Sequence, residues 1–119
     1  MAGDDLKLRT RSFALAVIRL VEKLPHGRTS DIIGKQLVRC GTSVGANYRA
    51  ACRARSQADF IAKLGIVEEE ADETIYWMDL LVQSKIVDHN YAKPLIAEAD
   101  QILAIIVASI RTARSNRQS

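Results

Sequence analysis

The spacing of apolar residues constrains this chain more than any other feature of its sequence. In four successive segments, apolar or small residues recur alternately three and four residues apart, which places them on one face of an α-helix. Pro25 and Pro94 are the only prolines, so the residues between them are free of the strongest helix breaker. The four predicted helices cover 6–24, 31–54, 57–84 and 90–114. Four amphipathic helices with short links predict an all-α protein, an antiparallel up-down four-helix bundle forming one domain over 1–119.

Residues at the segment boundaries predict how the helices begin. Thr29 or Ser30 is expected to cap the second helix, because a hydroxyl can accept a hydrogen bond from a free backbone N–H of the first turn. Ser56 is expected to cap the third helix for the same reason. Pro94 falls inside the second turn of the fourth helix, so we expect that helix to begin late or to kink there.

The amino terminus and the cysteines indicate the compartment. Residues 1–7 are acidic where a secretory signal would be basic, and no long apolar run follows them. The longest apolar run, 102–110, is too short to span a bilayer. Cys40 and Cys52 lie about 18 Å apart on one predicted helix and cannot form a disulfide within it. We therefore expect a cytoplasmic protein with reduced cysteines and no membrane partner.

The second predicted helix carries two apolar or small-residue stripes, which together cover more of its surface than one bundle core requires. Glycine costs about 1 kcal/mol relative to alanine inside a helix, so three glycines on one stripe indicate that another backbone approaches closely. We predict that this stripe is a subunit contact of a homo-oligomer; a central helix covered within its own subunit is the alternative. The predicted oligomer interface comprises Gly34, Val38, Gly41, Gly45 and Tyr48.

Polar residues interrupt the inner stripe of the same helix. Asn47 occupies a predicted core position, where an amide without partners would cost about 1–3 kcal/mol. In an antiparallel hairpin it would face the third helix, so we expect it to bond Glu69 or Glu70, or the backbone beside Gly65. A register-fixing polar pair is the expected role, ahead of a catalytic one. The predicted structural polar network comprises Thr42, Ser43, Asn47, Glu69 and Glu70.

Charge is segregated along the chain. Residues 1–55 hold 11 Lys and Arg against 4 Asp and Glu, residues 56–100 hold 3 against 10, and residues 101–119 hold 3 Arg and no acid. The acidic third helix would neutralise some of the cations; Arg39 is expected opposite the carboxylates at 72–73. The remaining cations predict a basic surface for an anionic partner such as RNA. The candidate nucleic-acid-binding residues are Arg9, Arg11, Arg19, Lys23, Arg49, Arg53, Arg111 and Arg114.

The sequence offers no clear catalytic arrangement. Glu70 and Glu73 match one half of the magnesium site of the all-α nucleotide pyrophosphohydrolases, but Glu98 is followed at the required spacing by Gln101 instead of an acid. No histidine lies near either cysteine in sequence, and no phosphate-binding glycine loop occurs. We therefore expect no catalytic residue, no metal and no cofactor; a magnesium-dependent nucleotide pyrophosphohydrolase is the remote alternative.

Three motifs carry a family likeness: Arg-Cys-Gly-Thr-Ser-Val-Gly-Ala-Asn at 39–47, Ser-x-x-Asp-Phe-x-x-Lys-Leu at 56–64 and Glu-Glu-Ala-Asp-Glu-Thr-x-Tyr-Trp-Met at 69–78. Together they resemble the four-helix-bundle proteins encoded in intervening sequences of 23S ribosomal RNA genes. The resemblance implies short bundles that assemble into homopentameric rings. Similar proteins accompany the reverse transcriptase of diversity-generating retroelements, and they bind nucleic acid and the transcriptase through a basic surface. Many members read Ala-Glu-Gly near positions 48–52, where this chain has Tyr-Arg-Ala-Ala-Cys, so no role of that glutamate transfers.

These observations predict a non-enzymatic, ring-forming homo-oligomer, a pentamer by resemblance, that presents a basic surface to RNA or to a nucleic-acid-processing protein. An assembly scaffold that binds no nucleic acid is the alternative.

Overall fold

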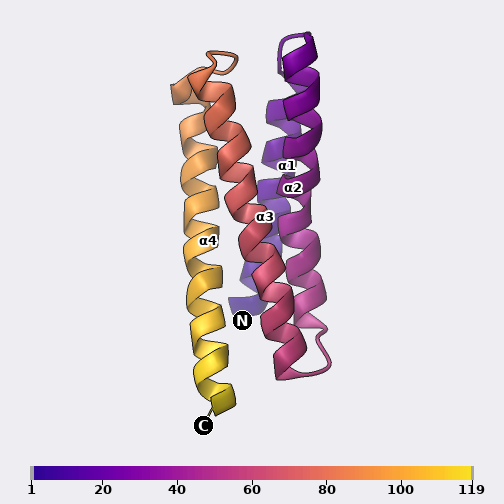
Figure 1. Ribbon diagram of the computed structural model, residues 1–119, viewed down its shortest axis with the longest axis vertical. Coiled ribbons are helices and arrows are strands. Elements are labelled where there is room, and N and C mark those ends of the chain that lie inside the picture. The colour runs from indigo at the N-terminus through magenta and orange to yellow at the C-terminus, as the bar shows by residue number, and fades with distance from the viewer. Residues whose placement is uncertain (1, 119) are drawn as a thin grey trace.

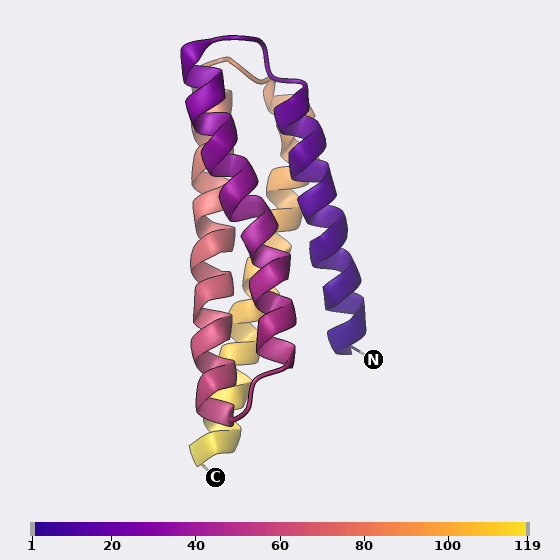
Figure 2. The same ribbon diagram turned by 90° about the vertical axis from the view of Figure 1, so that its right-hand side faces the viewer.

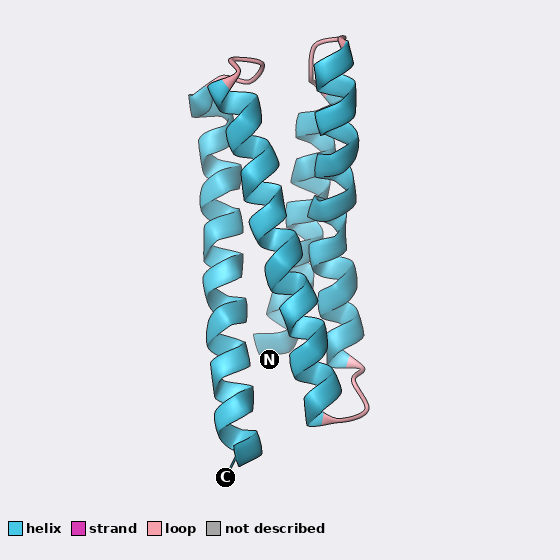
Figure 3. Cartoon of the chain, viewed as in Figure 1, coloured by secondary structure: helices cyan, strands magenta, loops and turns pink. Residues whose placement is uncertain are grey.

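Four long helices account for nearly the whole chain (Figures 1 and 3). The structure is a computed structural model, which describes the backbone of residues 2–118 and the side chains of residues 5–116. No helix begins or ends more than four residues from its predicted bound. The helices are α1 (Ala2–Glu22), α2 (Arg28–Cys52), α3 (Gln57–Gln83) and α4 (His89–Gln118).

The helices run up and down in chain order, and the all-α four-helix fold is confirmed. Each helix packs against its neighbours in sequence, and α1 and α4 close the bundle more loosely. The α1–α2 and α3–α4 loops lie at one end of the molecule, while the α2–α3 loop and both termini lie toward the other (Figures 1 and 2). The bundle measures 51 × 22 × 21 Å. This topology places the amino-terminal half of α1 beside the carboxyl-terminal half of α2.

The helix starts agree with the sequence in one case and differ in two. The Ser56 cap is confirmed, since its hydroxyl accepts a hydrogen bond from the Asp59 backbone N–H at 3.0 Å. The Thr29 or Ser30 cap is wrong: α2 begins at Arg28, preceded by Gly27 without a side-chain cap bond. Of the two effects expected of Pro94, the late start of α4 is wrong, because the helix begins at His89 and continues through Pro94, while the kink stays a prediction.

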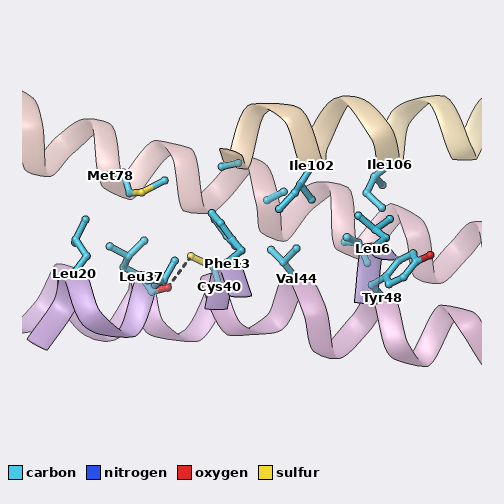
Figure 4. Close-up of a cluster of buried hydrophobic side chains, with 14 of the residues drawn as sticks. Leu6, Phe13, Leu20, Leu37, Cys40, Val44, Tyr48, Met78, Ile102 and Ile106 are labelled. Carbon is cyan, nitrogen blue, oxygen red and sulfur yellow. Dashed lines mark hydrogen bonds between the residues drawn. The ribbon is translucent and has the colours of Figure 1, made fainter. Parts of the chain in front are cut away.

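The core of the bundle is built from residues three and four positions apart on all four helices (Figure 4). Leu37, Val44 and Ile102 are among its fully buried side chains. Buried polar groups are satisfied inside their own helices: the Thr74 hydroxyl donates to the Glu70 carbonyl at 2.7 Å. No buried side-chain polar atom in the described part of the chain lacks a hydrogen-bond partner.

The glycine stripe of α2 packs against α1 of the same subunit. A Cβ at Gly41 would lie 2.8 Å from a methyl group of Val17, and one at Gly45 would lie 3.1 Å from the hydroxyl of Thr10. Gly34 is also buried, against side chains at the end of α1 and in the loop that follows it. The predicted close approach of another backbone is seen at Gly45, where a Cβ would lie 3.4 Å from the Thr10 carbonyl carbon, whereas Gly34 and Gly41 meet side chains of the same chain. The prediction that these glycines form an oligomer interface is therefore wrong.

Of the other two residues of the predicted interface, Tyr48 gives the same result, whereas for Val38 the prediction stays untested. Tyr48 is 7% exposed and belongs to the core cluster (Figure 4). Val38 is half-buried in a shallow hollow shared with α1. Because α2 packs between α1 and α3, most of both stripes is covered from within the chain. Its wide apolar surface is that of a central helix, the alternative reading of the pattern.

Membrane insertion is not indicated by the helices: none in the described residues 2–118 is long and apolar enough to cross a bilayer.

Candidate nucleic-acid interface

A groove between α1 and α2 collects cationic side chains from both helices. It has a volume of about 520 Å³. Lys7 and Arg11 line it from α1, and Arg49 and Arg53 line it from the end of α2. No carboxylate is found among the described residues that line it. We call this feature, defined by these four cations, the basic groove.

Helix geometry explains why the four cations meet. Lys7 and Arg11 are four residues apart, as are Arg49 and Arg53, so each pair lies on one face about 6 Å apart along its helix. The two helices come close at Gly45, which lines the groove and lacks a side chain to hold them apart. Arg49 and Arg53 also lie at the carboxyl end of α2, where the helix dipole favours positive charge.

The cations of the basic groove are accessible to a ligand. Among the residues whose side chains are described, none of the four makes an ion pair or a side-chain hydrogen bond. Arg11, Arg49 and Arg53 are exposed and Lys7 is half-buried. Four cations around one hollow attract a ligand that carries several negative charges.

Three of the eight predicted nucleic-acid-binding residues, Arg11, Arg49 and Arg53, come together in the basic groove. The sequence reasoning missed Lys7, although its spacing of four from Arg11 places the two on the same face of α1. Arg111 and Arg114 are exposed on the last turns of α4 and do not line this groove.

Arg9 has a different role from the predicted one. Its guanidinium donates two hydrogen bonds of 2.7 Å to the Glu98 carboxylate and a third, of 2.6 Å, to the Gln101 side chain. The bond to Glu98 raises the pKa of Arg9 above its usual value. Arg9 therefore joins α1 to α4 and is not available for a phosphate, so its assignment to the nucleic-acid surface is wrong.

Arg19 and Lys23 lie on the α4 side of α1, away from the basic groove. Both line a second groove of about 420 Å³ between α1 and α4. The Lys23 ammonium lies 5.9 Å from the centre of the Tyr91 ring, in cation–π range. The predicted basic residues of α1 therefore divide between two faces of that helix.

The acidic third helix neutralises Arg39, as the charge pattern predicted. Arg39 forms ion pairs with both Glu70 and Glu73, the first at 3.2 Å. Glu73 also accepts a hydrogen bond from the indole N–H of Trp77 at 2.9 Å. The expected pairing of Arg39 with Glu73 is confirmed. Asp72, the other expected partner, is exposed, and Glu70 pairs with Arg39 instead.

The predicted polar network between α2 and α3 does not form. The Asn47 amide donates to the Ser43 backbone carbonyl at 2.9 Å, within its own helix. The Thr42 and Ser43 hydroxyls donate to the backbone carbonyls of Val38 and Arg39, each at 2.6 Å. These bonds suffice because Asn47 is only half-buried, so its amide needs no partner from the third helix.

The two carboxylates of that predicted network lie elsewhere. Glu69 is exposed, and Glu70 bonds Arg39 instead of the polar residues of α2.

The carboxylates that matched a magnesium site are held by arginines. Glu70 and Glu73 pair with Arg39, and Glu98 pairs with Arg9 together with Gln101. Across the described residues, no group of three or more His, Cys, Asp or Glu side chains is placed to hold a metal ion. What these acids do in the structure is join neighbouring helices.

Comparison with known proteins finds one matching family model and a similar crystal structure. Residues 5–108 match the model of the family described as 23S rRNA-intervening sequence protein. A crystal structure of a protein with unknown function, from the S23 ribosomal protein family of Bacteroides thetaiotaomicron, is similar with a TM-score of 0.83 and 33% sequence identity. That similarity covers 88% of this chain and 97% of the other. No curated protein matches the chain.

Proposed function

Because the chain belongs to the 23S rRNA-intervening sequence protein family, in which the similar crystal structure has no function assigned, we propose a function from the surface of this chain. The protein is a non-enzymatic bundle that binds the phosphate backbone of RNA along the basic groove between α1 and α2.

The observation that carries this proposal is the composition of the groove. The chain has a formal net charge of only +3, yet this one hollow is lined by four cations that pair with no described side chain, and by no carboxylate among its described lining residues. Each phosphate that a Lys or Arg side chain neutralises releases counterions condensed on the nucleic acid, which drives binding at low salt. Basic residues that serve only to solvate a helix surface have no reason to gather around one hollow from two different helices.

We also propose that the protein self-associates, on grounds that do not involve the cations of the basic groove. The family resemblance implies a homopentameric ring. In support, α1 exposes Leu15, Ile18 and Leu8, the last of which also lines the basic groove, with exposed fractions of 36%, 36% and 64%. Their spacings of seven and three are those of a helix-packing seam. A ring would set several basic grooves side by side and strengthen binding to a long nucleic acid.

Light scattering on the purified protein tests the ring. The expected mass is five times the 13.2 kDa of one chain, and Ile18→Glu should lower it. A single-chain mass for the unaltered protein would refute the ring and leave the groove to be tested alone.

RNA binding is tested by fluorescence anisotropy with two charge reversals that change net charge equally. Arg49→Glu alters the basic groove, whereas Arg19→Glu alters an exposed arginine on the other side of α1. We expect Arg49→Glu to weaken binding about tenfold or more at 50 mM salt and to reduce the salt slope by about one, while Arg19→Glu changes affinity by about twofold at most.

Equal losses from the two variants would mean that net charge, and not the groove, attracts the RNA. No binding by the unaltered protein at low salt would refute RNA binding and favour the scaffold alternative. Circular dichroism of both variants checks that each remains helical.

A further inference from the structure

The polar chemistry of the basic groove defines what kind of nucleic acid it selects. We propose that the groove recognises phosphate alone, so that it prefers a duplex to a single strand and distinguishes neither base sequence nor RNA from DNA. This inference rests on the proposed function and narrows it to a ligand class.

Apart from the four cations, no described side chain that lines the groove has a hydrogen left to donate. The Thr10 hydroxyl is fully buried and donates to the Lys7 carbonyl at 3.1 Å. The Thr42 hydroxyl donates to the Val38 carbonyl at 2.6 Å. Most of the backbone on both walls is helical, so its N–H and C=O groups are paired within the helices. No neutral donor is left to recognise a ribose 2′-hydroxyl, the group by which proteins tell RNA from DNA.

The shape of the groove also separates its cations from the bases of a duplex. The four cations line a hollow that Gly45 and Ala46 also line. On a duplex the phosphates form the ridges, while the base edges lie at the bottom of grooves about 8 Å deep. A phosphate ridge can enter this hollow and contact cations from α1 and from α2 at the same time. Cations that hold a ridge from both sides meet phosphate oxygens and not the base edges beside it.

Single strands lack the contact that usually binds them. Proteins that hold unpaired bases stack them on aromatic rings, worth about 1–3 kcal/mol per base. No aromatic residue is among the described residues lining the groove. The aromatic residues of the two helices that form it, Phe13 and Tyr48, are buried in the core, with exposed fractions of 2% and 7%. Unpaired bases therefore gain nothing here.

The higher charge density of a duplex then favours it over a single strand. For four phosphate contacts, the logarithm of the binding constant falls with the logarithm of salt at a slope of about −3.6 for a duplex and about −2.8 for a single strand. Between 50 and 200 mM salt, duplex affinity should fall about 150-fold and single-strand affinity about 50-fold. A preference for duplex at low salt should thus shrink about threefold over this range.

The experiment measures anisotropy with a labelled 20-base-pair RNA duplex, a DNA duplex of the same sequence, an RNA duplex of unrelated sequence and an unstructured single strand of equal length. We expect the three duplexes to bind within about twofold of one another and more tightly than the single strand at 50 mM salt. Thr42→Val, which removes the remaining hydroxyl at the groove surface, should leave RNA affinity unchanged.

The possible failures separate this inference from the proposed function. Single-strand binding as tight as duplex binding, or a tenfold preference for one sequence or for RNA over DNA, would overturn phosphate-only recognition and leave RNA binding intact. A loss of RNA but not DNA affinity in Thr42→Val would overturn it as well. No binding of any of the four ligands, or binding that Arg49→Glu does not weaken, would refute the proposed function itself.

Discussion

Replacing Gly41 by alanine tests whether the glycine face of α2 is internal to the subunit. The new methyl group would lie 2.8 and 3.0 Å from the two methyl groups of Val17 and 3.2 Å from its Cβ. Val17 is fully buried and β-branched, so it has little freedom to move away. Overpacking of this kind costs about 1–3 kcal/mol. Alanine returns about 1 kcal/mol of helix propensity, so the net loss of stability should be about 0–2 kcal/mol.

Gly65 provides the matched control for this substitution. It is also inside a helix, and a Cβ built there has no neighbour within 4 Å. Gly65→Ala should therefore gain about 1 kcal/mol from propensity alone. The difference between the two variants isolates the packing cost, about 1–3 kcal/mol, which corresponds to a gap in Tm of about 4–12 °C for a domain of this size.

Chemical and thermal denaturation of both variants, with light scattering of each, complete the test. We expect Gly41→Ala to be less stable than Gly65→Ala and to have an unchanged oligomer mass. Equal stabilisation by the two alanines would show that α1 does not pack against Gly41. A reduced oligomer mass in Gly41→Ala, with the stability of the chain unchanged, would show that this face of α2 does form a subunit interface.

Three further outcomes follow from local contacts. Burial raises the pKa of the Cys40 thiol, so a thiol reagent should label only the exposed Cys52 in the folded protein at pH 8; rapid labelling of both would contradict the core packing. Ser56→Ala should lower the free energy of unfolding, measured in urea, by about 1 kcal/mol, since it removes the cap of α3. An unchanged free energy of unfolding would mean that the cap does not stabilise the helix. The hydrogen bond from Lys63 lowers the pKa of Asp59, so its stabilising effect is present above the unfolded pKa and is lost as pH falls through the folded one; Asp59→Asn should weaken the dependence of stability on pH below about 4, which acid titration of the unfolding midpoint measures.

The helices, and the contacts between two helices joined by one short turn, could be predicted from the sequence. Apolar spacing reports helix faces directly, and bounds followed from breakers and caps such as Ser56. The pairing of Arg39 with Glu73 was predictable because the register of an antiparallel hairpin is set by its turn. Asn47 was misplaced because periodicity gives a direction around the helix but not the depth of burial.

Contacts between helices distant in sequence could not be predicted in this way. Arg9 meets Glu98, 89 residues away, and no local pattern indicates that α1 closes the bundle against α4. The glycines of α2 correctly indicated a close backbone, but their spacing does not tell whether that backbone belongs to the same chain. Lys7 escaped notice because the groove depends on how α1 and α2 lie together, not on either helix alone.

The salt dependence of nucleic-acid affinity tests the central claim, that four converging cations bind phosphate. Duplex affinity is measured from 50 to 200 mM salt for the unaltered protein, Arg49→Glu and Arg19→Glu. The account predicts a slope of about −3.6 that becomes about one less steep in Arg49→Glu and stays the same in Arg19→Glu. A slope near zero, or the same slope in all three proteins, would contradict it.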